Sequence, residues 1–152
     1  MTPTAGVFEG REHVLPVRVY YEDTDFTGLV YHANYVRYFE RGRSDFLRLA
    51  GVSHSDLLVG DAPIAFVVTR MEIDFRSPGR IDDALVVRTT YDTARGPRLS
   101  ISQRILRDET LVAAAKVEAV CIGLDGRPRK PPKSLVALLS PWFAPQAAGD
   151  LA

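Results

Sequence analysis

The sequence contains a single cysteine, Cys121, so no disulfide bond can form within the chain. Neither charge is in excess, because 19 lysine and arginine residues balance 19 aspartate and glutamate residues. Such a chain creates no overall field that favours nucleic acid or an anionic membrane. No apolar run reaches the roughly 18 residues needed to cross a bilayer. Residues 1–11 also lack the basic start and apolar core of a secretion signal. We therefore expect a cytoplasmic protein that neither spans a membrane nor binds nucleic acid.

A length of 152 residues and a hydrophobic fraction of 46% are typical of one globular domain with a sizeable core. Residues 1–12 are small and polar and include two glycines, which indicates a loose N-terminal tail. We expect a single domain over residues 13–140 and a C-terminal tail over residues 141–152. Cys121 lies in an apolar run, and we expect it to be a buried and unreactive thiol.

The hydrophobic pattern changes its period along the chain. Residues 14–21 alternate as in a strand, whereas apolar residues in 32–50 recur every three or four positions, as in a helix. Gly42 in the middle of that helix costs about 1 kcal/mol relative to alanine, which indicates a close approach by a sheet. The remaining pattern has a period of two and is broken by turn formers, in residues 64–76, 85–91, 99–105 and 111–121. This order predicts an α+β fold, with one long helix wrapped by a curved antiparallel sheet of about five strands.

An acidic turn, EDTDFTG over residues 22–28, lies between the first strand and the helix. Asp25 stands seven residues before His32, near which the helix begins. A helix N-terminus offers free N–H groups and the positive end of the dipole, which together stabilise the oxyanion formed when a carbonyl is attacked. A carboxylate on the adjoining loop could attack that carbonyl or activate water for the attack. The same acids could instead cap the helix or bind a metal, although no second ligand cluster appears elsewhere.

The run YEDTDFTGLVYHANY, residues 21–35, closely resembles the active-site segment of hotdog-fold thioesterases. The branch that it resembles is the 4-hydroxybenzoyl-CoA thioesterase type, and the closer match is to the tol-pal system-associated acyl-CoA thioesterases. The likeness is strongest over residues 18–48 and continues more loosely through DFRSPGRIDDALVV, residues 74–87. The order of elements is also that of the hotdog fold, so the resemblance covers about residues 14–124.

The resemblance implies a role for individual positions. Asp25 matches the family's catalytic carboxylate, and the main-chain N–H of His32 matches the group that polarises the thioester carbonyl. Tyr31 and Asn34 match positions beside the acyl pocket. Gly28 would let the main chain come close to a ligand. The expected activity is therefore hydrolysis of acyl-CoA thioesters, with Asp25 as nucleophile or general base.

One departure from the family pattern is visible directly after the catalytic carboxylate. Phe26 and Thr27 replace the small residues often found there, which puts the acyl chain length in doubt but not the class of reaction. No metal or other cofactor is implied, because the coenzyme A thioester is itself the substrate. The phosphates of coenzyme A need basic contacts, for which the candidates are Arg76, Arg80, Arg129 and Lys130.

The resemblance also implies partners. The family places its active site between two protomers, so we expect a homodimer or a homotetramer. The substrate is a small-molecule acyl-CoA, with acyl carrier protein as an alternative carrier of the acyl group. A link to the Tol–Pal system of the cell envelope is implied by the family likeness alone.

Three other functions are compatible with parts of the sequence. A hotdog protein could bind acyl-CoA or acyl carrier protein without catalysis, because fold does not settle function. A hotdog dehydratase is less consistent with the sequence, since no His–acid pairing on the helix is evident. Residues 23–27 (DTDFT) also satisfy the D-x-D-x-T pattern of Mg²⁺-dependent phosphatases. That class requires strands alternating with helices in a parallel sheet, which this pattern does not indicate.

Overall fold

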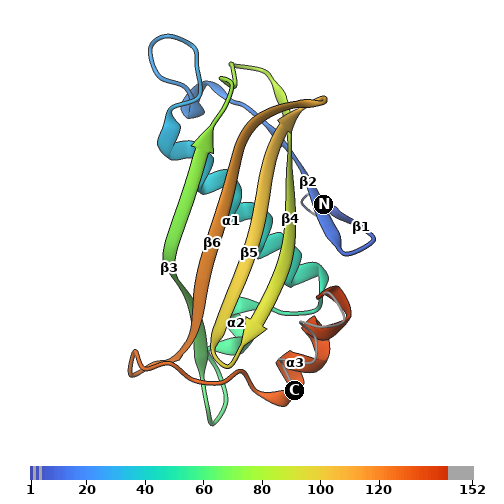
Figure 1. Cartoon of the computed structure of the whole chain (residues 1–152), viewed down its shortest axis with the longest axis vertical. Helices are drawn as coiled ribbons and strands as arrows, with labels where there is room; N and C mark the ends of the chain where they lie inside the picture. Colours follow the sequence, from blue (N-terminus) through green and yellow to red (C-terminus); the bar gives the residue numbers. More distant parts are fainter. Residues whose placement is uncertain (2, 4, 144–152) are drawn as a thin grey trace. The chain divides into compact units, whose positions relative to one another are not determined.

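The computed structural model describes residue 1, residue 3 and residues 5–143. Figure 1 shows the elements in chain order. The strands are β1 (Val7–Glu9), β2 (Glu12–Arg18), β3 (Ile64–Phe75), β4 (Ala84–Arg95), β5 (Arg98–Arg107) and β6 (Thr110–Gly123). The α-helices are α1 (His32–Leu49), α2 (His54–Leu57) and α3 (Lys133–Leu139), and 3₁₀ turns span η1 (Tyr21–Asp23) and η2 (Ser140–Trp142).

The six strands form one antiparallel sheet in the order β1-β2-β4-β5-β6-β3 (Figure 1). Strand β2 pairs with β4 in a register that places Leu15 opposite Val87. Tight turns connect β4 to β5 and β5 to β6. Gly96 in the first turn and Asp108 in the second both adopt the left-handed conformation that such turns need. The predicted α+β class with one long helix is confirmed.

The sheet has six strands rather than about five, because residues 7–9 form β1. Sequence analysis placed these residues in the N-terminal tail, but Val7 pairs with Val14 and Phe8 pairs with His13. Gly10, with φ of +61°, provides the tight turn between the two strands. The Phe8 ring packs edge-on against Phe46 of α1, with ring centroids 5.0 Å apart. A three-residue strand is too short to show an alternating pattern, so its tertiary contacts determine it.

The main chain of α1 approaches the sheet closely at Gly42. A Cβ at this position would lie 2.8 Å from Thr89 Oγ1 and 2.9 Å from Val87 Cγ1, both on β4. Next to it, Gln103 Nε2 of β5 donates to the main-chain oxygen of Phe39 at 2.8 Å. The expected close contact between helix and sheet at Gly42 is therefore confirmed.

The residues group into two compact units. The first comprises residues 1–46, 73–89 and 103–115, and the second comprises 47–72, 90–102 and 116–152. In the first unit, Tyr38, Phe39, Phe46, Leu85 and Ile105 are fully buried. In the second unit, the buried side chains include Ile64, Leu99, Leu135, Leu139 and Phe143. The single domain predicted over residues 13–140 stays a prediction, and most of the predicted C-terminal tail lies outside the described residues. Over the described part of the chain, no helix is both long and apolar enough to cross a membrane.

Candidate active site

Asp25 lies at the start of a tight turn in the first unit. Its main-chain N–H donates to the Leu29 oxygen at 2.9 Å, and the Gly28 N–H donates to the Asp25 oxygen at 3.1 Å. Gly28 has a φ of +80°, a left-handed conformation that strains residues bearing a side chain. Just outside the turn, Thr24 and Val30 form an isolated antiparallel bridge. The turn therefore places Asp25 across from Leu29, which precedes the first residue of α1 by only three positions.

The Asp25 carboxylate is exposed and is held within its own turn. The main-chain N–H of Thr27 donates to Asp25 Oδ1 at 2.8 Å, and the Thr27 hydroxyl donates to the same oxygen. These hydrogen bonds, first the one from the hydroxyl, lower the pKa of Asp25 below its usual value of 3.8. The carboxylate is therefore ionised at neutral pH, as a nucleophile or general base must be.

Asp23 joins this loop to the beginning of α1. Its main-chain oxygen accepts hydrogen bonds from the Tyr31 N–H at 3.0 Å and from Asn34 Nδ2 at 2.7 Å. Its buried carboxylate accepts the Tyr20 N–H at 2.8 Å. Asn34 is likewise buried. The contacts of Asp23 thus hold the loop in place.

Two main-chain donors remain available at the N-terminus of α1. Tyr31 donates its N–H to Asp23, and the Asn34 N–H donates to the Tyr31 oxygen at 2.8 Å. Among the described residues, no acceptor is found for the N–H groups of His32 and Ala33. A pair of free N–H groups at the positive end of a helix dipole can stabilise an oxyanion. The sequence analysis singled out His32 and missed Ala33, although the second position of any helix carries the same free donor.

The turn between β3 and β4 packs against this region. The Val30 N–H donates to the Gly79 oxygen at 2.8 Å, and the Gly79 N–H donates to the Tyr35 hydroxyl at 2.9 Å. The Ile81 N–H donates to the Gly28 oxygen at 3.1 Å. A Cβ at Gly79 would lie 3.0 Å from Val30, so a larger residue would push the turn away.

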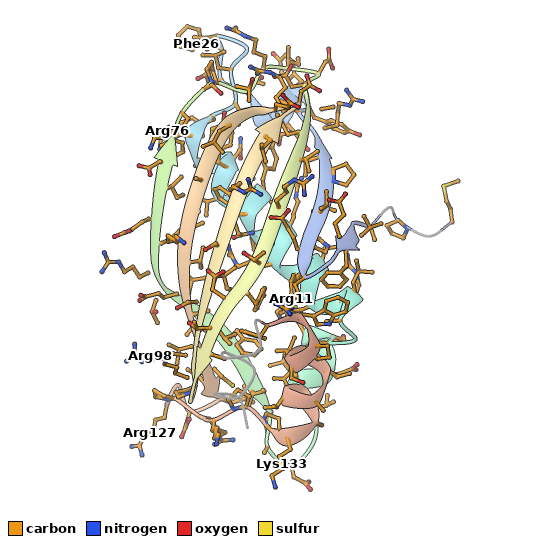
Figure 2. All side chains as sticks on the ribbon, turned by 45° about the vertical axis from the view of Figure 1, so that its right-hand side comes forward. Arg11, Phe26, Arg76, Arg98, Arg127 and Lys133 are labelled. Carbon is orange, nitrogen blue, oxygen red and sulfur yellow. The ribbon has the colours of Figure 1, made fainter. Side chains whose placement is uncertain are left out.

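Several aromatic side chains around the turn are exposed. Phe26 is fully exposed and stands at the outer end of the turn (Figure 2). Tyr31 is 49% exposed and Phe75 of β3 is 51% exposed. The Phe75 ring makes an edge-to-face contact with His32, with centroids 6.2 Å apart. Sequence reasoning missed Phe75, because it lies more than 40 residues from the helix start and only the fold brings them together.

The candidate contacts for coenzyme A phosphates fall in two groups. Arg76 and Arg80 belong to the first unit, which also contains Asp25, and both are exposed. The main chain of Arg80 bridges to Leu29, whereas Arg76 lies just after β3 with its guanidinium 3.8 Å from Asp74. Arg129 and Lys130 belong to the second unit, where both are exposed. Arg76 and Arg80 are therefore the candidates that lie in the same unit as the turn.

Two other features belong to the second unit. A shallow pocket is lined by Arg95, Arg98 and Glu118 among others, and no residue of the Asp25 turn lines it. Cys121 is buried, and burial raises the pKa of its thiol, so it stays protonated and unreactive at neutral pH. Among the described residues, no group of three or more His, Cys, Asp or Glu side chains is placed to hold a metal ion.

Comparison with known proteins gives consistent matches. The thioesterase-like superfamily matches residues 19–145 of this chain. The acyl-CoA thioester hydrolase YbgC of Escherichia coli is 45% identical over 124 residues, which cover 80% of this chain and 91% of that protein. The acyl-CoA thioesterase YbgC of Haemophilus influenzae is 39% identical over 109 residues, covering 72% of this chain and 79% of that protein. The crystal structure of a probable thioesterase from Bartonella henselae has 43% identity and a TM-score of 0.77, and it covers 80% of this chain and 99% of that one.

The chain belongs to the thioesterase-like superfamily and has the hotdog fold. The family resemblance found over residues 21–35 is thereby confirmed. The D-x-D phosphatase alternative is set aside, because it requires a parallel sheet and the sheet here is antiparallel.

Proposed function

We propose that this chain hydrolyses acyl-CoA thioesters, with Asp25 as the catalytic carboxylate and the N–H groups of His32 and Ala33 as the oxyanion hole. The observation that carries the proposal is an ionised carboxylate on a loop that Asp23 ties to the first turn of α1, where two main-chain donors are free. The names of the relatives from Escherichia coli and Haemophilus influenzae support the same reaction.

The chemistry needs few groups, because a thioester carbonyl is already electrophilic. In one route, Asp25 attacks the carbonyl carbon, the C–S bond breaks, and water then hydrolyses the mixed anhydride. In the other, Asp25 takes a proton from a water molecule that attacks the carbonyl directly; the C–S bond then breaks, and the leaving thiolate takes up the proton. Both routes place negative charge on the carbonyl oxygen, where the two N–H donors stabilise it. The products are the free acid and the thiol of coenzyme A.

The surroundings of the turn suggest how the substrate is held. Exposed aromatic rings at Phe26, Tyr31 and Phe75 offer apolar surface for an acyl group, while Arg76 and Arg80 offer charge for phosphates. The same exposed rings favour coverage by a second copy of the chain, in a homodimer or homotetramer. Acyl carrier protein as the carrier, a cytoplasmic location and a role with the Tol–Pal system stay predictions.

The proposal is tested by thiol release from a panel of acyl-CoA substrates, using Asp25→Asn beside the wild type. This change keeps the side-chain volume and removes the charge, so kcat should fall about 100-fold or more. Asp108→Asn is the matched control: it is an exposed aspartate in the β5–β6 turn, with a left-handed φ that asparagine also tolerates.

The control should stay within about twofold of the wild type. Hydrolysis by Asp25→Asn within about threefold of the wild type would overturn the assignment of Asp25. Substrate binding with no hydrolysis by the wild type, across the panel, would favour the alternative of a binding protein without catalysis.

A further inference from the structure

Thr27 makes two hydrogen bonds to the same oxygen of the Asp25 carboxylate. Its main-chain N–H donates to Oδ1 at 2.8 Å, and its hydroxyl donates to the same atom. The main chain of Leu29 also interacts favourably with this carboxylate, but less strongly than the two Thr27 donors. Thr27 therefore holds Oδ1 of the carboxylate with two donors.

The Asp25 carboxylate depends on these hydrogen bonds for its orientation. The side chain is exposed, so no packed neighbours restrict its rotation. An unrestrained aspartate distributes itself among about three staggered wells of its first torsion. Thr27 selects one of these wells, because only one orientation brings Oδ1 to the Thr27 donors.

The hydrogen bond from the Thr27 hydroxyl to the Asp25 carboxylate is separate from the hydrogen bonds that close the main-chain turn. The turn is closed by hydrogen bonds from the Gly28 N–H to Asp25 and from the Asp25 N–H to Leu29. Neither bond involves the side chain of Thr27. Removal of the Thr27 hydroxyl should therefore loosen the carboxylate, which keeps the hydrogen bond from the Thr27 N–H, and leave the path of the turn unchanged.

We propose that Thr27 is a positioning residue whose hydroxyl holds Oδ1 of Asp25, so that Oδ2 faces the thioester carbonyl or the water that attacks it. This inference rests on the proposed function of Asp25. Correct orientation of a reacting group contributes a large part of catalysis. The rate falls in proportion to the fraction of time that the group spends outside its reactive orientation. Phe26 and Thr27 replace the small residues often found at these positions in the family. The hydrogen bond from the Thr27 hydroxyl therefore depends on a residue at which this chain departs from the family pattern.

Two effects of the hydroxyl oppose each other, and their sizes decide the expected result. The hydrogen bonds favour the ionised form, which makes Asp25 a slightly weaker base or nucleophile. At neutral pH the carboxylate is ionised with or without them, so little is gained in reactivity when the hydroxyl is lost. Loss of orientation over about three torsional wells lowers the productive fraction by up to about threefold. The net effect of removing the hydroxyl is therefore a slower reaction.

The test compares Thr27→Val, Thr27→Ser and Thr24→Val in the full chain, with Asp25→Asn beside them. Thr27→Val keeps the shape and removes the hydroxyl, and kcat should fall about two- to threefold while KM stays nearly unchanged. Thr27→Ser keeps the hydroxyl and should recover most of that loss. Thr24→Val is the matched control, because the Thr24 hydroxyl donates to the Tyr21 oxygen at 2.8 Å and does not contact Asp25.

A second measurement separates positioning from general damage to the loop. The carboxyl of Asp25 can be titrated by carbon-13 NMR without substrate, with Asp25→Asn used to assign its signal. The pKa of Asp25 should rise in Thr27→Val and stay at the wild-type value in Thr27→Ser and Thr24→Val.

The possible outcomes are distinct. Equal kcat and equal Asp25 pKa in Thr27→Val and the wild type, with Asp25→Asn inactive, would overturn the role of Thr27 and leave Asp25 catalytic. An equal loss in Thr24→Val would also overturn it, since any loop hydroxyl would then have the same effect. Full activity of Asp25→Asn would overturn both proposals.

Discussion

The side-chain amide of Asn34 donates to the main-chain oxygen of Asp23 at 2.7 Å, so the first turn of α1 and the loop that carries Asp25 share one buried contact. The Tyr31 N–H reaches the same oxygen. The separation between carboxylate and helix tip therefore depends on a few hydrogen bonds between parts of the chain about ten residues apart.

Replacement of Asn34 should affect both stability and activity. Asn34→Ala removes the amide donor and should lower the free energy of unfolding by about 1–2 kcal/mol in urea. Asn34→Asp keeps the shape but turns an acceptor toward the Asp23 oxygen, so the loss should be larger. If both variants unfold at the wild-type urea concentration, the contact contributes nothing to stability.

The oxyanion role of His32 concerns its main chain, which proline can test. Proline is tolerated at the first position of a helix and has no N–H, so His32→Pro removes one donor while it preserves the helix. Loss of one oxyanion donor should lower kcat about 10²–10³-fold. His32→Ala keeps the N–H and removes only the ring, so its loss should be far smaller. Equal losses in the two variants would assign the effect to the imidazole.

The pH dependence of hydrolysis should follow the lowered pKa of Asp25. Protonation removes the reactive charge, so activity is present above the pKa and is lost as the pH falls through it. Because the Thr27 hydrogen bonds lower that pKa, the midpoint of the acid limb of kcat/KM should lie below 3.8. Short assays in acidic buffers, with recovery of activity at pH 7 to exclude unfolding, would measure it. A midpoint above 4.5 would contradict the carboxylate environment described.

Gly42 should resist replacement by alanine even though alanine favours helices. The propensity gain of about 1 kcal/mol is outweighed by the approach of the new Cβ to Thr89 and Val87, at 2.8 and 2.9 Å. Such overpacking typically costs 1–3 kcal/mol, so Gly42→Ala should lower the melting temperature. Arg37→Ala, an exposed change on the same helix, should leave it nearly unchanged. A more stable Gly42→Ala variant would show that the helix can move away from the sheet.

A buried polar contact between His13 and Asp45 ties the N-terminal segment to α1. Asp45 Oδ2 lies 2.8 Å from His13 Nε2 and accepts the Gly6 N–H at 2.7 Å, and both side chains are buried. Removal of one partner leaves the other buried polar groups unsatisfied, so Asp45→Ala should lower the free energy of unfolding by about 1–3 kcal/mol. Asp45→Asn keeps an acceptor oxygen and should lose less. Urea unfolding of the two variants measures the difference, and a loss below 1 kcal/mol in Asp45→Ala would refute the estimate.

Much of the fold was predictable because its determinants are local. The change from a period of two to a period of three or four separated strand from helix near His32, and Gly42 indicated the contact with the sheet. Strand β1 was missed because three residues carry no periodic signal, and Phe8 is fixed by its contact with Phe46.

The site was predictable to a lesser extent. Asp25 and His32 emerged from a family resemblance together with the chemistry of a helix N-terminus. Thr27 was noticed only as a departure, because the sequence cannot show that its hydroxyl reaches Asp25. Phe75 was invisible as a neighbour of His32, since only the packing of β3 near the helix start brings the rings together.

The turn between β3 and β4 contains no residue expected to touch the reacting atoms, yet Gly79 accepts a hydrogen bond from Val30 and donates one to Tyr35. These two hydrogen bonds connect the turn after β3 to the first turn of α1 and to Val30 in the loop just before it. Substitutions in that turn that are selected for another property, such as binding of the acyl carrier or of another protein, would shift these hydrogen bonds. They would therefore also alter turnover. Evolution could therefore tune this enzyme's turnover without changing a residue that contacts the reacting atoms.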